Sequence, residues 1–131
     1  MIDLATLTGA VVVALGHELT GAMGNDDELI NELIESGKRT SEGVWPLPIL
    51  DLHKDDMKGT VGDLRNISGP STGAGSSTGG AFLSYFVSET SWVHLDIAGS
   101  AWGAAQRDYQ GGEKGTGVGV RLLMDYLRST K

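Results

Sequence analysis

The spacing of apolar residues changes along this chain, and the first stretch has the pattern of a buried strand. Residues 2–7 form a short apolar run that is typical of a strand covered on both faces. Gly9 then opens a turn, and the wholly apolar residues 10–15 predict a short buried helix ended by Gly16. Such a strand needs a neighbour on each side. Because no earlier element supplies one, we expect the chain to be a segment of a longer polypeptide.

A second helix is indicated by both its start signal and its periodicity. After a predicted strand over residues 17–23, Asn25 stands three residues before Glu28, which is the spacing of a capping box. The apolar residues that follow predict one buried face, formed by Leu29, Ile30, Leu33 and Ile34. Gly37 is expected to end this helix.

Prolines and small residues determine what the middle of the chain can form. Two prolines within residues 44–49 exclude a central strand, because proline lacks the N–H donor, and they predict an edge strand or an extended connector. Residues 50–57 predict a short helix. Residues 68–80 are nearly all Gly, Ser, Thr, Ala and Pro, and we interpret them as a functional loop rather than a linker, with a helix that starts near its end.

Residues 92–99 predict the second clear strand, and the end of the chain predicts a last helix. In the strand, three apolar side chains alternate with His94 and Asp96, which therefore share one face. Helical spacing predicts that the last helix buries Val120, Leu123, Met124 and Leu127 and exposes a charged ladder of Arg121, Asp125 and Arg128. Strands alternating with helices predict the α/β class, as a three-layer sheet with helices on both faces.

Length, composition and charge narrow the classes of function. With 131 residues the chain is sufficient for one domain, residues 1–131, with its own core. Its longest apolar run is far shorter than a membrane span, so we expect no membrane partner. The net charge of -7 argues against a nucleic-acid partner. The absence of cysteine and of a secretory signal before the first apolar run fits a cytoplasmic location.

One motif suggests a serine nucleophile, but its context argues against that role. Residues 75–79 match G-x-S-x-G, which would place a nucleophile at Ser77. A nucleophile elbow directly follows a strand, whereas residues 68–74 contain no apolar run, and no histidine follows the later aspartates. We interpret the match as a product of the small-residue composition. The same stretch lacks the lysine of a phosphate-binding P-loop.

Two clusters contain side chains of the kind that bind divalent cations. His53 precedes Asp55 and Asp56, and we interpret this group as a solvated helix face. His94 and Asp96 share a strand face, and we interpret them as a buried pair bonded to each other or to the backbone. No set of three or four metal ligands can be assembled from the sequence with either cluster.

Five short segments, taken together, resemble one known family. They are residues 2–10 (IDLATLTGA), 62–67 (GDLRNI), the Gly-Ser-Thr stretch leading into 81–83 (AFL), 94–99 (HLDIAG) and 115–117 (GTG). Their order and spacing are those of the leucyl aminopeptidases, the cytosol aminopeptidase family of two-metal exopeptidases. The resemblance implies that this chain is the C-terminal portion of an incomplete catalytic domain. It further implies an activity that releases N-terminal, leucine-like residues from peptides with two divalent cations, manganese or zinc.

The resemblance also implies that the reactive groups lie outside this chain. In the family, the metal-binding carboxylates and the catalytic lysine and arginine lie upstream, and the signature Asn-Thr-Asp-Ala-Glu-Gly-Arg is absent here. We therefore expect the isolated chain to bind no metal and to be inactive. By match to the family, the residues that border the bound peptide or line its side-chain pockets are Thr6, Leu7, Gly9, Ile67, Ala98 and Ala101.

Each of these residues has a distinct implied role. Backbone groups of Leu7 and Gly9 would bind the peptide, Ala98 and Ala101 would line the pocket for the N-terminal side chain, and Ile67 would line the next pocket. The resemblance implies a peptide substrate for the parent enzyme and self-association as a homo-oligomer, a hexamer in the family. The alternative is a non-catalytic module that uses the same scaffold for assembly or ligand binding.

Overall fold

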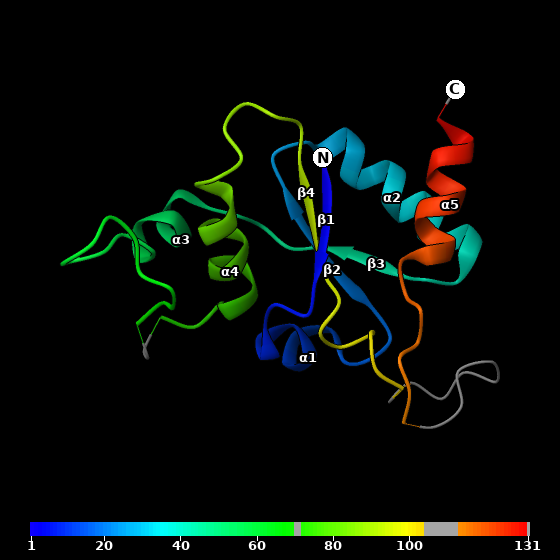
Figure 1. Ribbon diagram of the computed structural model, residues 1–131, viewed down its shortest axis with the longest axis horizontal. Helices are drawn as coiled ribbons and strands as arrows, with labels where there is room; N and C mark the ends of the chain where they lie inside the picture. Colours follow the sequence, from blue (N-terminus) through cyan, green and yellow to red (C-terminus); the bar gives the residue numbers. More distant parts are fainter. Residues whose placement is uncertain (70–71, 104–112, 131) are drawn as a thin grey trace.

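A four-stranded sheet with helices on both faces forms the structure (Figure 1). The computed structural model describes residues 1–69, 72–103 and 113–130. The strands are β1 (Ile2–Ala5), β2 (Thr20–Gly24), β3 (Val44–Pro46) and β4 (Val93–Asp96). Their order across the sheet is β1-β4-β2-β3. The β1–β4 and β2–β3 pairs are parallel, and β2 runs antiparallel to β4.

Five helices in the described residues cover the two faces of the sheet. They are α1 (Gly9–Leu15), α2 (Asp27–Thr40), α3 (Asp51–Asp56), α4 (Gly75–Ser84) and α5 (Val120–Ser129). Helices α2 and α5 lie side by side on one face, whereas α1 and α4 lie on the other, with α3 packed against α4 (Figure 1). The predicted α/β class is confirmed. None of the helices in this part of the chain has the length and apolar character needed to span a membrane.

The main core lies between the sheet and the α2–α5 pair. Its buried residues are Ala22, Leu29, Ile30, Leu33, Val44, Val93, Leu95 and Leu122. The alternation predicted for β4 is confirmed, because Val93 and Leu95 belong to this core while all four residues of the strand are buried. Strand β1 differs from the prediction. It lies at the edge of the sheet with β4 as its partner, and its residues are half-buried rather than covered on both faces.

Helix α2 begins and ends at other residues than its sequence signals suggest. The N-cap is Asp26, whose side chain accepts a hydrogen bond from the Leu29 N–H at 3.0 Å. Asn25 instead accepts a hydrogen bond from the Trp92 N–H at 2.8 Å and so ties the start of α2 to β4. Gly37 lies within the helix, where a Cβ would be 2.6 Å from the Glu42 carbonyl oxygen. This glycine therefore permits a close approach of the next loop instead of ending the helix.

Two helices on the opposite face also depart from expectation. Helix α1 is not buried all round, because Val13 is almost fully exposed and Val11 is its one buried residue. Helix α4 begins at Gly75, inside the stretch interpreted as a loop. Its small residues allow close packing, since a Cβ at Gly75 would lie 2.8 Å from the Ala10 Cβ and one at Gly79 would lie 2.9 Å from the Thr8 Cγ2. Tertiary packing thus outweighs the low helix propensity of this stretch.

The burial predicted for α5 is wrong except at Leu123, which is half-buried and packs against the main core. Leu122 is the buried residue of this helix, whereas Val120 and Leu127 are each 64% exposed. In the expected exposed ladder, Arg121 and Arg128 are exposed as predicted, whereas Asp125 is half-buried and pairs with Arg39 of α2 at 2.7 Å. The predicted apolar face left out Leu122, which is buried in the core, and Tyr126, which packs against that core.

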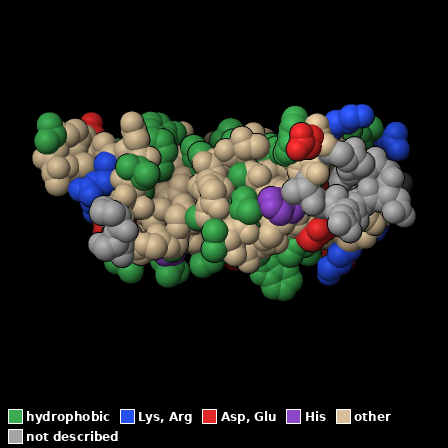
Figure 2. Space-filling view, turned by 90° about the horizontal axis from the view of Figure 1, so that it is seen from below, with side chains coloured by type: hydrophobic (Ala, Val, Ile, Leu, Met, Phe, Trp, Pro, Cys, Tyr) green, Lys and Arg blue, Asp and Glu red, His purple; other side chains and the backbone are tan. Residues whose placement is uncertain are grey.

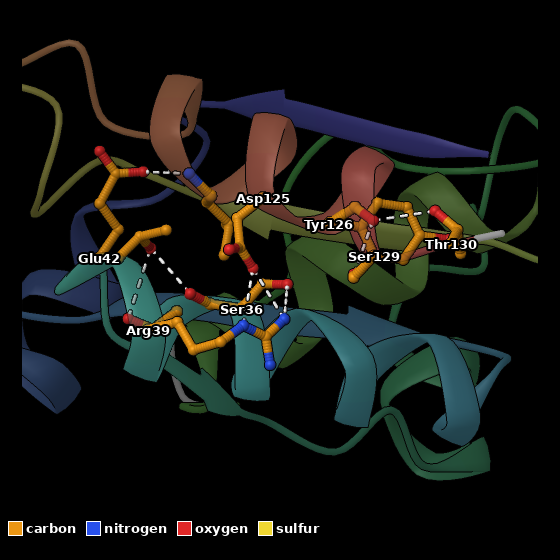
Figure 3. A network of polar contacts seen from close by, with 10 residues as sticks. Ser36, Arg39, Glu42, Asp125, Tyr126, Ser129 and Thr130 are labelled. Carbon is orange, nitrogen blue, oxygen red and sulfur yellow. Dashed lines mark hydrogen bonds and ion pairs between the residues drawn. The ribbon is translucent and has the colours of Figure 1, made fainter.

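Polar contacts join α5 to the end of α2 and to the loop after it (Figure 3). The buried Glu42 carboxylate accepts hydrogen bonds from the N–H groups of Gly119 at 3.0 Å and Leu122 at 2.9 Å. These donors belong to the first turn of α5, which has no side-chain cap of its own. Arg121 also donates to Glu42, at 3.1 Å. Glu42 therefore acts as the N-terminal cap of a helix that lies 77 residues later in the chain.

Replacing Glu42 by alanine should destabilise the fold substantially. The substitution leaves two buried N–H groups without an acceptor, which costs about 1–3 kcal/mol per group. We expect Glu42→Ala to lower the free energy of unfolding in urea by at least about 2 kcal/mol. Glu35→Ala, which removes only an exposed ion pair with Lys38, should leave it nearly unchanged, because solvent screens such a pair. Equal effects of the two variants would contradict the capping role.

Acid should weaken the contact between α2 and α5. Hydrogen bonding to the Arg39 guanidinium lowers the pKa of Asp125. Because the pKa is lower in the folded state, the stability that this ion pair supplies is present above about pH 4, the usual range of aspartate, and is lost as the pH falls through the folded value. We expect Asp125→Asn to show a shallower loss of unfolding free energy between about pH 5 and pH 2. An unchanged slope would contradict this contribution.

Candidate functional site

Two turns leave the sheet side by side at the ends of β1 and β4. Because the strands are parallel, Ala5 lies opposite Asp96, and the Ile97 N–H still donates to the Ala5 carbonyl at 2.9 Å. Residues 6–9 and 97–101, here called the first and second turns, therefore begin at the same edge. In open α/β sheets, ligands bind beyond the carboxyl ends of strands. This edge is the candidate binding site.

The candidate edge has a largely uncharged surface. Figure 2 views the molecule from below Figure 1, the side on which β1 ends, and its centre carries mostly backbone, small polar and hydrophobic side chains. Acidic and basic side chains gather towards the two ends of this face. A hollow lined by Met1, Ile2, Leu29 and Tyr126 lies at the amino end of β1, away from this edge. The candidate edge thus suits a ligand that is recognised mainly by backbone groups and apolar contacts.

A buried aspartate joins the two turns. Asp96 is fully buried at the end of β4. Its Oδ1 accepts hydrogen bonds from the N–H groups of Leu7 at 3.2 Å and Ala98 at 3.2 Å, with the Thr8 N–H at 3.5 Å. Its Oδ2 accepts a hydrogen bond of 2.6 Å from the Thr8 hydroxyl. One carboxylate therefore orients backbone groups in both turns.

Thr8 connects this carboxylate to two helices. Its Oγ1 accepts a hydrogen bond from the Val11 N–H at 3.2 Å, which caps α1. The same oxygen lies 3.1 Å from the Ser76 Oγ of α4. Since the single hydroxyl proton of Thr8 goes to Asp96, the Ser76 hydroxyl is the donor in that contact. The first turn is thus fixed by α1, α4 and β4 together.

The second turn is held by backbone contacts of its own. The Ala101 N–H donates to the Ile97 carbonyl at 2.9 Å, and the Ala101 carbonyl accepts from the Thr116 N–H at 2.9 Å. His17 binds the Gly99 carbonyl through Nδ1 at 2.8 Å. A Cβ at Gly99 would lie 2.2 Å from the Gly16 carbonyl oxygen, so only glycine allows this turn to approach the end of α1.

The structure brings most of the predicted site residues to one edge. Thr6, Leu7 and Gly9 lie in the first turn, and Leu7 is 38% exposed. Ala98 and Ala101 lie in the second turn and are half-buried. Ile67 lies apart from both turns in sequence, after α3, with its side chain 79% exposed. The residue after Ile67, Ser68, is linked to α4 by a contact of 3.4 Å between its hydroxyl and that of Thr78.

The histidines and carboxylates singled out in the sequence have structural partners. His94 does not pair with Asp96; its Nδ1–H donates to Asp3 at 2.6 Å, and Trp92 donates to the other oxygen of Asp3 at 2.6 Å. Both residues are buried, and Asp96 bonds to backbone as interpreted, but the interpretation is wrong for His94, because its partner is the Asp3 side chain. His53 is buried and accepts from the Leu50 N–H at 3.1 Å, so it is not part of a solvated face.

Neither a metal site nor a serine nucleophile is supported by the described geometry. Within residues 1–69, 72–103 and 113–130, no three His, Asp or Glu side chains converge as metal ligands. Ser77 lies buried on α4, and the residue before that helix, Ala74, has a left-handed backbone rather than a strand conformation. The nucleophile elbow is therefore rejected on geometry as well as on sequence.

Sequence reasoning missed the contribution of Ser76 and the link that Asp96 makes between the two turns. Ser76 gave no signal, because its stretch resembled a loop and its partner Thr8 lies 68 residues away. Asp96 was recognised as buried and bonded, but its link to both turns depends on strand order, which periodicity does not reveal. Its position at the last residue of a buried strand, two residues before Ala98, was the available signal.

Comparison with known proteins identifies relatives along the whole chain. The family model of the catalytic domain of the cytosol aminopeptidase family matches residues 1–124. A "Probable cytosol aminopeptidase" of Geobacter sp. (strain M21) is 52% identical over 98% of this chain, and one of Geobacter sulfurreducens is 50% identical over 99%. The Neisseria meningitidis protein of the same description is 45% identical over 98%. In each case the match spans 26% of the relative's length.

Two glycines of the candidate edge should respond oppositely to alanine. A Cβ at Gly9 would meet no atom within 4 Å, so Gly9→Ala should keep or slightly raise the melting temperature. Gly99→Ala forces a clash with backbone and should lower the free energy of unfolding by at least about 1–3 kcal/mol. Thermal and urea unfolding of both variants tests this contrast. A destabilised Gly9→Ala with an unaffected Gly99→Ala would contradict the geometry.

Proposed function

The chain belongs to the cytosol aminopeptidase family, and from this premise we propose that it supplies one side of the peptide-binding cleft of an aminopeptidase. The observation that supports the proposal best is the pair of turns held together by Asp96 at the carboxyl edge of β1 and β4. The chain spans about a quarter of the length of its curated relatives. The complete active site is therefore proposed for a longer polypeptide that includes this segment.

In this proposal the first turn binds the backbone of the peptide. The Leu7 N–H already donates to Asp96, so its carbonyl is the group left to accept a hydrogen bond from substrate. Gly9 is the first residue of α1, where an N–H has no acceptor within the helix. The open space around its Cα gives a peptide room to approach the backbone closely. Thr6 borders the same part of the first turn.

The second turn supplies the pocket for the N-terminal side chain. Ala98 and Ala101 have the smallest side chains that still carry a Cβ, which leaves space for a bulky apolar residue such as leucine. Ile67 contributes an exposed apolar side chain to the wall of the next pocket. The substrate class is thus a peptide with a free amino terminus and an apolar first residue.

The hydrolytic groups are proposed to lie in the rest of the longer polypeptide. No convergent set of metal donors is present in the described part of this chain, so its residues do not fit a two-metal centre. We infer that two divalent cations, manganese or zinc, are held by ligands outside this chain, and that the chain alone is inactive. The cytoplasmic location and the homo-oligomeric, hexameric assembly are part of the same proposal.

A second candidate function follows from the absence of a convergent set of metal donors in the described residues. A non-catalytic module could use the same two turns to bind a peptide or another copy of the chain without hydrolysis. That alternative predicts peptide binding by the chain but no activity even when the remaining part of a relative is supplied.

Activity in a chimera tests the proposed function. The matching quarter of the Geobacter sulfurreducens relative is replaced by residues 1–131, and hydrolysis of leucine p-nitroanilide is measured with added manganese. We expect turnover in the chimera and none in the isolated chain. Gly9→Ala, which leaves folding intact, should reduce kcat/KM in the chimera by at least about tenfold, since misplacement of substrate at a cleft wall has effects of this size.

Two results would contradict the proposal. The first is a folded chimera that binds manganese as the unmodified relative does but shows no turnover. The second is measurable hydrolysis by the isolated chain, which would mean that it contains reactive groups of its own. The unmodified relative, assayed under identical conditions, provides the reference for both.

A further inference from the structure

The two turns of the candidate site share a single anchor, the side chain of Asp96. The first turn donates to it through Leu7 and Thr8, and the second turn donates to it through Ala98. Asp96 lies 88 and 89 residues from its partners in the first turn. We propose that Asp96 is a positioning residue that sets the relation between the two walls of the peptide cleft. This inference rests on the proposed function.

A carboxylate suits this position because it only accepts hydrogen bonds. Its two oxygens face four donors: three backbone N–H groups and the Thr8 hydroxyl. An amide at the same place would offer one acceptor oxygen and would turn an NH2 group towards one of these donors. The Asp96 side chain is fully buried, so water is not available to replace a lost partner.

The partners of Asp96 show that it orients backbone rather than neutralising a cation. Among residues 1–69, 72–103 and 113–130, no Lys or Arg side chain forms an ion pair with it. Its donors within the described part of the chain all belong to the two turns. By fixing the direction of the Leu7 N–H, Asp96 also fixes the opposite direction of the preceding carbonyl, that of Thr6, because the peptide group is planar.

The consequence is a coupling between the two proposed subsites. The first turn would hold the peptide backbone and the second would hold its first side chain, so a substrate bound productively has to fit both at once. Small displacements of a bound substrate have large effects on rate. Loss of the shared anchor should therefore weaken binding and slow turnover together, even though Asp96 itself touches no substrate.

Hydrogen exchange in the isolated chain tests the anchor directly. We expect Asp96→Asn to accelerate exchange of the Leu7, Thr8 and Ala98 amides by at least about tenfold, the change expected for loss of one ordinary hydrogen bond. Glu42→Gln is the matched control, because it makes the same carboxylate-to-amide change at a buried site that caps α5. It should accelerate exchange at Gly119 and Leu122 and leave both turns unchanged.

A milder variant covers the case in which Asp96→Asn does not fold. Thr8→Val keeps the shape of the side chain but removes the hydroxyl that donates to Asp96. Because that hydroxyl also caps α1 at Val11, exchange is read at Leu7, whose amide bonds to Asp96 and not to Thr8. Thr8→Val should accelerate exchange in the first turn by about threefold to tenfold. Exchange in the two turns that is unaltered in every folded variant at position 96 or 8 would overturn the anchoring role.

Kinetics in the chimera separate positioning from stability. With leucine p-nitroanilide, Asp96→Asn should raise KM at least about fivefold and lower kcat, so that kcat/KM falls at least about thirtyfold. The control Glu42→Gln should keep both KM and kcat within about twofold of the unsubstituted chimera. Equal kinetic effects of the two variants would overturn the proposal. If the unsubstituted chimera is inactive, the proposed function fails, and hydrogen exchange alone decides whether Asp96 joins the two turns.

Discussion

The parallel pairing of β1 with β4 is the constraint on which the candidate site depends. Because both strands run in the same direction and in register, their carboxyl ends meet, and the turns that follow them start as neighbours. Residues nearly ninety positions apart in the sequence thereby come within hydrogen-bonding distance of one carboxylate. Antiparallel pairing of the same strands would have sent the two turns to opposite ends of the sheet.

Two buried carboxylates perform the same physical task in different parts of the molecule. Asp96 binds the turns at the candidate edge, and Glu42 binds the first turn of α5. In both cases backbone N–H groups, several of them from distant segments, provide most of the donors that a buried carboxylate needs. These contacts fix where segments without regular structure lie, which apolar packing alone does not specify. Glycines complete the arrangement, since Gly37 and Gly99 allow the backbone to approach closely in each region.

The elements that could be predicted from sequence are those whose signal is local. The alternation in residues 92–99 predicted β4 correctly, because side chains alternate along any strand. The apolar run in residues 2–7 predicted a strand at β1 but not its half-buried place at the edge of the sheet. Helix α4 was missed over half its length, since its composition is that of a loop and its stability comes from packing against the first turn. The buried face of α5 was predicted wrongly because apolar spacing favoured Val120 and Leu127, whereas Leu122 and Tyr126 face the core and distant polar contacts from Arg39 and Glu42 accompany this packing.

The candidate site was accessible to sequence reasoning only in part. Resemblance to a family supplied Thr6, Leu7, Gly9, Ala98 and Ala101, and the fold brings these residues to one edge. The interaction that joins them, through Asp96, followed from strand order and could not be read from spacing.

The most direct test is a crystal structure of the longer, chimeric polypeptide with a non-hydrolysable dipeptide analogue. The account predicts that the analogue contacts residues 6–9 and 98–101 while the Leu7 N–H stays bonded to Asp96; an analogue bound away from both turns would contradict it.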